Sequence, residues 1–404
     1  MISTQKAKIV IVSSILEDWG GSEELWAKAL PFLQSAGFQL YVMKYKINFE
    51  HPKFVELAAK GVILEEYQPK KPKQGLVARV TQRLYRAATS RFTKKEKQIK
   101  YVFTKKILQI SPDLVIIAQG INFDGLGNAY QCAEHGIPYI VVAQKAVDFY
   151  WPQDFERSYM KAALLKAKRC FFVSQHNARL TEEQFGMRLA NAEVIQNPVK
   201  IRKGVIKYPT PGDEFRLACI GRLFLLDKGQ DILIRILAQS KWQERPVKVS
   251  FIGTGVDRQG LQEMAAFLNV KNVEFIGHVD DIEEIWKSHH ALVLPSRSEG
   301  QPLAMLEAMA AGRPVIVSRA GGIAEVVQEG KNGFIGHANE DSFDAAMERA
   351  WAARYDWENM GREGAERVAK LIPYIPEDEF AARILTIASG ADKIKSETLD
   401  TELA

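Results

Sequence analysis

Short runs of β-branched and other apolar residues alternate with longer helical patterns along almost the whole chain. In the first half, these runs predict strands at Lys8–Ser13, Phe38–Val42, Val62–Leu64, Leu114–Ala118, Tyr139–Val142, Cys170–Val173 and Glu193–Ile195. In the second half, they predict strands at Phe215–Ile220, Val247–Ile252, Val273–Ile276, Ala291–Pro295, Pro314–Ser318 and Phe334–Ile335. Strands that alternate with helices are typical of βαβ units and parallel sheets. The pattern therefore predicts an α/β fold with two Rossmann-like, doubly wound domains.

The stretch Val199–Asp213 interrupts this alternation, because it has no hydrophobic period and is rich in glycine and proline. A chain of 404 residues also exceeds what one hydrophobic core usually organises, so two domains are the first expectation and one large domain is the alternative. We expect an N-terminal domain over residues 1–200, joined by a helix over 375–390. A C-terminal domain is expected over 201–374 and a flexible tail over 391–404.

Composition is that of an ordinary globular protein, with 47% hydrophobic and 25% charged residues. The three cysteines, Cys132, Cys170 and Cys219, have neither metal-ligand nor redox spacing, as expected in a reducing cytoplasm. The first apolar run, Ile9–Val12, is too short for a signal peptide core or a membrane span. These features predict a cytoplasmic location.

The net charge of +5 hides a strongly basic stretch. Between Lys70 and Lys106 there are thirteen Lys or Arg residues and one acid, Glu96. Aromatic residues such as Tyr101 and Phe103 lie among these cations, which favours a surface for anionic lipid head groups. A solvated helical excursion and a contact to an anionic glycan are the alternatives. No recognisable RNA-binding motif accompanies the stretch, so no nucleic-acid partner is expected.

The first predicted strand of the second half runs into a turn that combines two glycines with two cations. Gly221-Arg222 and Lys228-Gly229 precede an apolar helix that begins at Ile232. Glycines allow close approach of the backbone, while the planar fork of Arg and the compact charge of Lys suit a diphosphate. On its own, such a turn would be interpreted as a solvated loop.

A second turn carries carboxylates. Ser296–Leu303 contains Glu299 and leads into the predicted helix Ala304–Ala311, which carries Glu307. The free N–H groups of a first helical turn suit a phosphate. An ionised carboxylate only accepts hydrogen bonds, so two of them beside a phosphate site indicate a ligand rich in hydroxyl groups. Together the two turns predict a site for a sugar nucleotide in the cleft between the domains, where the carboxyl ends of both sets of strands meet.

These residues resemble glycosyltransferase family 4, the retaining enzymes with the two-domain glycosyltransferase B (GT-B) architecture. The likeness is strongest over Phe215–Gly333, and a looser match in the first half is the glycine loop Asp18–Glu24. The pieces that carry it are Gly221-Arg222-Leu223, Asp227-Lys228-Gly229-Gln230-Asp231, Gly253-Thr254-Gly255, Glu299-Gly300, Leu306-Glu307-Ala308, Gly312-Arg313-Pro314 and Asn332-Gly333.

The resemblance implies a catalytic set in which Arg222 and Lys228 bind the donor diphosphate and Glu299 binds hydroxyl groups of the transferred sugar. Many members have a His where this chain has Gln144, so the implied role of that residue is a hydrogen bond to the donor sugar rather than proton transfer. Asp148 is an implied acceptor contact. The remaining donor-binding residues that the resemblance implies are Gly20, Gly21, Gly221, Gly253, Gly277, His278, Gly300, the backbone of Gln301, Pro302 and Leu303, and Glu307 at the ribose.

The function implied is retaining transfer of a hexose-type sugar from a UDP- or GDP-sugar to a glycan or lipid-linked acceptor, in bacterial polysaccharide or glycolipid synthesis. We expect no metal, since the chain has no Asp-x-Asp motif, and no cofactor, since the sugar nucleotide is a co-substrate. The basic stretch would place the protein at the inner face of the membrane. A sugar-nucleotide epimerase of the same architecture and a non-catalytic nucleotide-sugar-binding protein are the alternatives.

Overall fold

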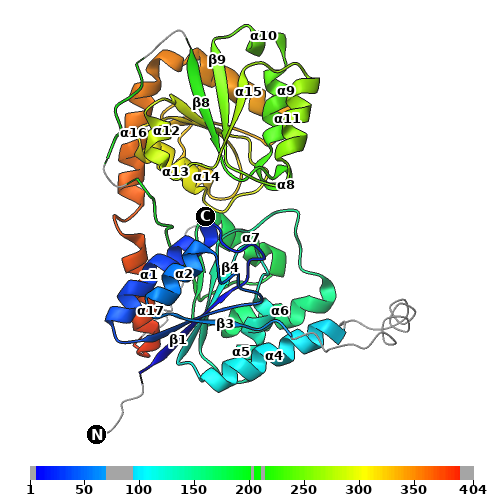
Figure 1. Ribbon diagram of the computed structural model, residues 1–404, viewed down its shortest axis with the longest axis vertical. Coiled ribbons are helices and arrows are strands. Elements are labelled where there is room, and N and C mark those ends of the chain that lie inside the picture. The colour runs from blue at the N-terminus through cyan, green and yellow to red at the C-terminus, as the bar shows by residue number, and fades with distance from the viewer. Residues whose placement is uncertain (1–5, 70–93, 202–203, 211–213, 392–404) are drawn as a thin grey trace, which may run out of the picture.

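The structure, a computed structural model, describes residues 6–69, 94–201, 204–210 and 214–391 of the chain. These residues form two α/β domains, which lie one above the other in Figure 1. Each domain is built on one open sheet in which the paired strands run parallel. The predicted α/β fold with two doubly wound domains is therefore confirmed.

The sheet of the N-terminal domain has seven strands in the order β3-β2-β1-β4-β5-β6-β7. The strand order reverses between β1 and β4, as in other doubly wound sheets. The strands are β1 (Lys8–Ser13), β2 (Gln39–Lys44), β3 (Ile63–Glu66), β4 (Leu114–Gln119), β5 (Tyr139–Ala143), β6 (Cys170–Phe172) and β7 (Ala192–Val194). The ends of the seven predicted strands differ from these by no more than two residues.

The sheet of the C-terminal domain has six strands in the order β10-β9-β8-β11-β12-β13, with the reversal between β8 and β11. The strands are β8 (Phe215–Ile220), β9 (Val247–Ile252), β10 (Val273–Gly277), β11 (Ala291–Leu294), β12 (Val315–Ser318) and β13 (Gly333–Gly336). Its helices are α8 (Leu225–Lys228), α9 (Gln230–Leu237), α10 (Ser240–Gln243), α11 (Arg258–Phe267), α12 (Ile282–Trp286), α13 (Leu303–Ala310), α14 (Ile323–Val326), α15 (Glu340–Ala352) and α16 (Trp357–Leu371), with the 3-10 turn η3 (Arg354–Asp356).

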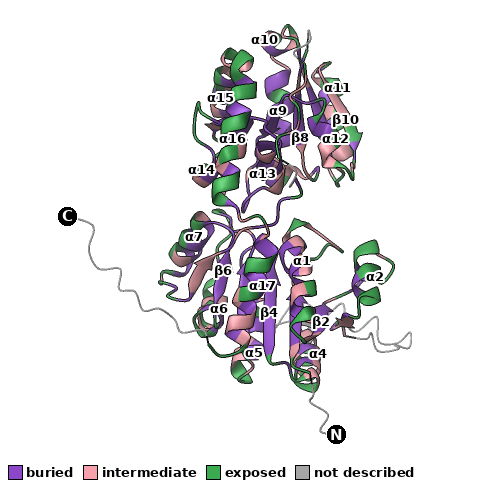
Figure 2. Ribbon diagram, turned by 90° about the vertical axis from the view of Figure 1, so that its left-hand side faces the viewer, coloured by how far each residue is buried: buried purple, intermediate pink, exposed green. Residues whose placement is uncertain are grey.

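Helices cover both faces of the N-terminal sheet, so its strands are apolar on both sides. Successive strand residues point to opposite faces, which is why Ile9 and Ile11 of β1 join one core while Val10 and Val12 join the other. Figure 2 shows these buried strands between helices whose outer surfaces are exposed. The helices are η1 (Gly21–Glu23), α1 (Glu24–Ser35), α2 (Pro52–Ala59), α4 (Lys94–Ile110), α5 (Leu126–Glu134), α6 (Asp154–Lys166) and α7 (Gln175–Phe185).

The last helix that the structure describes returns to the N-terminal domain. α17 (Pro376–Ala388) follows α16 and packs against α1 on the first sheet (Figure 1). Phe380 and Ile384 are fully buried there, and the ring of Phe380 meets Phe171 edge-on at 5.5 Å between centroids. Arg383 also donates to both carboxylate oxygens of Glu193, at 2.7 and 2.6 Å. α17 is therefore an integral part of the N-terminal core.

The segment between the domains is fixed to the C-terminal domain by a buried arginine. Arg313 is 0% exposed, and its guanidinium donates to the carbonyl oxygens of Ile206 (3.1 Å) and Lys207 (2.9 Å). Its Nε donates to the carbonyl oxygen of His289 at 3.0 Å. Burial lowers the pKa of Arg313 to about 10, but the group stays charged at neutral pH. One buried cation thus bonds to carbonyl groups of the connecting segment and of the C-terminal domain.

Only part of the basic stretch lies within the described residues, because residues 70–93 fall outside them. Its C-terminal part begins α4, where Tyr101 is 65% exposed and Phe103 is fully buried in the core. The expectation that Phe103 belongs to a membrane-facing surface is therefore wrong, since its ring packs against Tyr67. No helix within the described ranges combines the length and the apolar character needed to cross a bilayer.

Candidate functional site

The turn after β8 brings Lys228 to Glu299. Gly229 ends α8 with a φ of 61°, and a Cβ at this position would lie 2.3 Å from the carbonyl oxygen of Pro295, so only glycine fits. This close approach puts α8 against the loop after β11. The ammonium Nζ of Lys228 lies 2.6 Å from Oε1 of Glu299, whose side chain is almost fully buried. Two residues of the predicted catalytic set are thus in direct contact.

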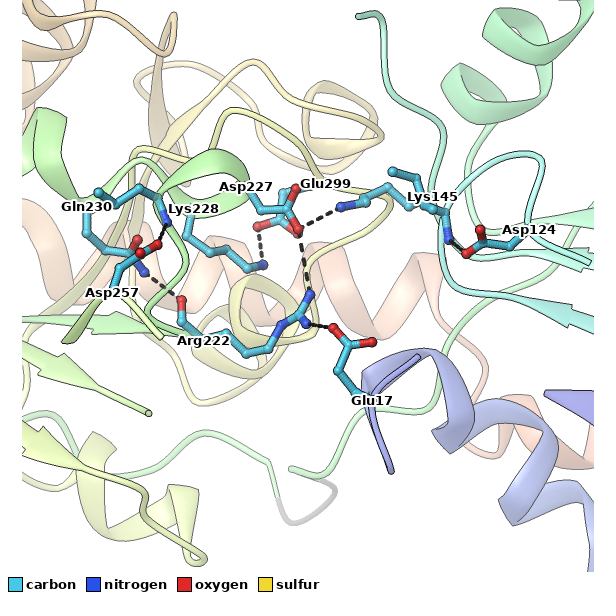
Figure 3. Close-up of polar contacts among 11 residues, drawn as sticks. Glu17, Asp124, Lys145, Arg222, Asp227, Lys228, Gln230, Asp257 and Glu299 are labelled. Atoms are coloured by element: carbon cyan, nitrogen blue, oxygen red, sulfur yellow. Dashed lines mark hydrogen bonds and ion pairs between the residues drawn. The ribbon is translucent and has the colours of Figure 1, made fainter. Parts of the chain in front are cut away.

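The third residue of that set, Arg222, is half exposed and lies between two carboxylates (Figure 3). Its Nη1 donates to Glu17, which belongs to the loop after β1 in the N-terminal domain. Its Nη2 lies 3.6 Å from Oδ2 of Asp227, and the same oxygen accepts a 2.9 Å hydrogen bond from Nζ of Lys145. Lys145 is the second residue after β5, so two cations from different domains meet at one carboxylate.

Glu17 is ionised at neutral pH. Burial raises its pKa, but a hydrogen bond from the backbone and the positive charge of Arg222 outweigh that effect, and the net result is a lowered pKa. Arg222 is therefore neutralised by Glu17 and Asp227, and Lys228 by Glu299.

The two turns of the C-terminal domain are tied together through Asp227 and Asp231. The carbonyl oxygen of Asp227 accepts hydrogen bonds from the backbone N–H groups of Arg297 (2.8 Å) and Ser298 (3.0 Å). The guanidinium of Arg297 in turn makes two bonds to the carboxylate of Asp231, at 2.6 and 2.8 Å. These contacts fix the position of the cation turn, residues 221–229, relative to the carboxylate loop, Ser296–Leu303, which carries Glu299.

That loop leads through Gly300 and Gln301 to Pro302, which is the N-cap of α13. The expectation that the backbone of Gln301, Pro302 and Leu303 all donates to phosphate is wrong for Pro302, because proline has no N–H. Gln301 and Leu303 retain their N–H groups, and Leu303 precedes the first hydrogen bond within the helix, from Met305 to Pro302.

Glu307 lies on α13 with its side chain buried and with Oε1 lacking a hydrogen-bond partner. Burial raises its pKa to about 7, although the charge of Lys200 and a hydrogen bond from the backbone of that residue act in the opposite direction. A buried acceptor without a partner is costly unless a ligand supplies the missing donor. The position therefore suits a ligand hydroxyl group.

Three of the predicted glycines line up at the carboxyl ends of β8, β9 and β10. A Cβ on Gly253 would lie 2.1 Å from the carbonyl oxygen of Gly221, and the N–H of Gly253 donates to the carbonyl oxygen of Gly277 at 2.7 Å. His278 follows Gly277, but its ring is exposed and lies 3.2 Å from Oδ1 of Asp280. The three glycines thus lie close together, while the imidazole ring of His278 points to solvent.

The N-terminal domain meets this site through its own strand ends. Gly21 lies opposite α13, where an added Cβ would approach the Leu303 side chain to 3.5 Å, and Gly20 is the N-cap of the 3-10 turn η1. A Cβ on Gly300 would lie 1.8 Å from the carbonyl oxygen of Gln144, so glycine is required for the two domains to pack.

Gln144 is buried, and its Oε1 accepts a 2.8 Å hydrogen bond from Nδ2 of Asn197. Its Nε2 is buried without a partner. The side chain is therefore oriented as a hydrogen-bond donor. Asp148, the predicted acceptor contact, lies in an exposed turn, and no contact between described residues joins it to the charged cluster.

Sequence reasoning missed Glu17, Lys145, the side chain of Asp227, and Asp124. Asp124 follows β4, and burial raises its pKa to about 6 despite a hydrogen bond from the N–H of Ile121. All four residues follow the carboxyl end of a parallel strand, and that position was the available signal. Glu17 and Lys145, however, pair with Arg222 and Asp227, which are distant from them in sequence. In the described part of the chain, no three His, Cys, Asp or Glu side chains are grouped so as to hold a metal ion.

Comparisons with known proteins agree with this geometry. Residues 214–353 match the family model of the group 1 glycosyl transferases. The chain is 34% identical over 173 residues to an uncharacterised glycosyltransferase of Methanocaldococcus jannaschii, a match that covers 37% of this chain and 44% of the relative. It is 29% identical over 191 residues to the D-inositol 3-phosphate glycosyltransferase of Corynebacterium urealyticum, covering 41% of this chain and 45% of the relative. The chain thus spans less than half the length of these curated relatives.

The crystal structure of the Anabaena protein HepE in complex with UDP has a similar fold. The TM-score is 0.69 at 17% sequence identity, and the match covers 94% of this chain and all of the other. This likeness extends over both domains, whereas the family match lies in the C-terminal domain, where the cation turn and the carboxylate loop meet. Residues 214–353 are therefore similar in sequence to the group 1 glycosyl transferases, and the chain as a whole has the two-domain GT-B fold.

Proposed function

We propose that this protein transfers a hexose-type sugar from a UDP- or GDP-sugar to a hydroxyl group of a glycan or lipid-linked acceptor. The observation that carries the proposal is the pairing of Arg222 and Lys228 with carboxylates beside the N-terminus of α13. Two cations and the positive end of a helix dipole form a site for a doubly charged diphosphate. The two curated relatives are glycosyltransferases by name, and HepE has been crystallised with UDP.

The proposed reaction places negative charge on the departing nucleoside diphosphate. The bond between the anomeric carbon and the phosphate oxygen breaks, and preorganised donors lower the barrier by stabilising the charge that develops on that oxygen. Arg222 and Lys228 supply this stabilisation without a metal ion. Glu299, released from Lys228, would accept hydrogen bonds from hydroxyl groups of the sugar, and Glu307 would accept those of the ribose.

The orientation of Gln144 supports a mechanism that needs no protein base at this position. A primary amide neither takes up nor releases a proton near neutral pH, and Nε2 of Gln144 is the free end of the side chain. In our proposal, the acceptor oxygen bonds to the anomeric carbon on the face from which the diphosphate departs. The acceptor proton moves to the departing phosphate oxygen, so the anomeric configuration is retained.

The first prediction concerns the donor and the metal. Thermal unfolding should shift upward selectively with UDP or with GDP rather than with ADP, and EDTA should leave the shift unchanged. A ligand at a hundred times its dissociation constant adds about 2.7 kcal/mol to the free energy of unfolding. Absence of a shift with both UDP and GDP would contradict the proposed donor class, and loss of the shift in EDTA would contradict metal-independent binding.

The second prediction concerns the Lys228–Glu299 pair. With the donor identified in this way, Lys228→Met should lower kcat by about a hundredfold to a thousandfold, the usual cost of removing one group that stabilises a developing oxyanion. Glu299→Gln should also lower kcat, because one acceptor oxygen is lost. Lys331→Met is the matched control, since this exposed lysine pairs with Glu363 at the surface. Equal activity of Lys228→Met and the control would argue against the proposed site.

The third prediction is stereochemical. NMR of the anomeric proton in the new glycosidic bond should show the configuration of the donor sugar. An inverted product would rule out attack on the face of departure. Formation of an altered sugar nucleotide without any acceptor would instead indicate the epimerase.

The fourth prediction concerns location. We propose that the protein works in the bacterial cytoplasm at the inner face of the membrane, in polysaccharide or glycolipid synthesis, with Lys70–Lys106 meeting anionic lipid head groups. Attraction of several cations should make the protein sediment with vesicles that contain anionic lipid, and less so at high salt. Equal sedimentation with neutral and anionic vesicles would contradict this placement.

A further inference from the structure

Lys145 is a cation of the N-terminal domain that lies inside the predicted diphosphate site of the C-terminal domain (Figure 3). Its Nζ is 2.9 Å from Oδ2 of Asp227, the oxygen that Arg222 approaches to 3.6 Å. The side chains of Lys145 and Asp227 are only 15% and 11% exposed, so this pair is largely removed from water.

A main-chain contact holds Lys145 at the site independently of this ion pair. Gln144 is the residue before Lys145, and its carbonyl oxygen packs closely against Gly300. A Cβ added to Gly300 would lie only 1.8 Å from this oxygen. Gly300 belongs to the loop that leads into α13. The backbone that carries Lys145 therefore rests on the approach to the helix N-terminus while its side chain reaches the cation turn.

The ammonium group of Lys145 can donate further hydrogen bonds in this position. A lysine has three N–H donors, and Asp227 accepts only one of them. Asp227 is itself held in place, because its carbonyl oxygen accepts the N–H groups of Arg297 and Ser298. An incoming diphosphate that displaced Glu17 from Arg222 and Glu299 from Lys228 would leave Asp227 and Lys145 where they are, with two N–H groups available.

We propose that Lys145 is the third cation of the diphosphate site, supplied across the domain interface to the nonbridging oxygens of the donor diphosphate. This inference rests on the proposed function. Three cations in a partly buried site bind a diphosphate better than a monophosphate, because the additional phosphate brings further charge and acceptor oxygens. Lys145 also makes donor binding depend on contact between the two domains, since the other two cations belong to the C-terminal domain.

The alternative is that Lys145 merely bridges the domains through its pair with Asp227. Three variants separate the roles. Asp227→Asn removes the charge pairing from this bridge but leaves all three cations. Glu17→Gln does the same to another ion pair between the domains, the one on Arg222. Lys145→Met removes a cation while keeping most of the apolar stem of the side chain.

The test is isothermal titration of the four full-length proteins with the nucleoside diphosphate that the wild type prefers and with the corresponding monophosphate. Lys145→Met should raise the Kd for the diphosphate by about tenfold to a hundredfold, as expected for charge-assisted hydrogen bonds. Its Kd for the monophosphate should change less than about threefold. Asp227→Asn and Glu17→Gln should bind the diphosphate as tightly as the wild type or more tightly, since each frees a cation. Circular dichroism and thermal melts establish that each variant is folded.

Unchanged diphosphate affinity in Lys145→Met would overturn the inference and leave the proposed function standing. Equal weakening in Lys145→Met, Asp227→Asn and Glu17→Gln would also overturn it, because loss of the bridge would then account for the effect. A wild-type protein that binds no nucleoside diphosphate would overturn both the inference and the proposed function.

Discussion

The need to neutralise partly buried positive charge governs the interface between the domains. Lys228 and Lys145 are mostly withdrawn from water and Arg222 partly so, and each has a carboxylate as its partner. A buried charge without a partner costs several kcal/mol. Glu17, Asp227 and Glu299 therefore compensate the cations that we assign to the diphosphate. In this account, the donor diphosphate replaces the carboxylates of Glu17 and Glu299 as the partner of the cations.

The fold allows this exchange because the carboxyl ends of two parallel sheets supply the charged residues. Glu17 and Lys145 follow β1 and β5, while Arg222 and Glu299 follow β8 and β11. Close packing of the intervening turns depends on glycine: a side chain at Gly229, Gly253 or Gly300 would collide with a carbonyl oxygen at 2.3 Å or less. The return of α17 to the first sheet makes a second covalent and packed connection between the domains. The close backbone packing that these glycines allow therefore also brings the cations to their carboxylate partners.

Local patterns predicted much of the fold and of the C-terminal half of the site, because both depend on short-range information. Buried β-branched runs place strands within two residues of their observed ends, and the cation turn and Glu299 lie in recognisable segments. Contacts between domains were beyond such reasoning: Glu17 lies 205 residues from Arg222, and Lys145 lies 82 residues from Asp227. Phe103 was misplaced because its aromatic ring lies among cations in sequence, yet helix periodicity turns it into the core.

The most direct measurement of the central claim is a crystal structure of the protein with its preferred nucleoside diphosphate. Our account predicts phosphate oxygens at Arg222, Lys228 and Lys145, with the carboxylates of Glu17 and Glu299 withdrawn from Arg222 and Lys228. A bound nucleotide that left both of these ion pairs intact and placed its phosphates elsewhere would contradict the account.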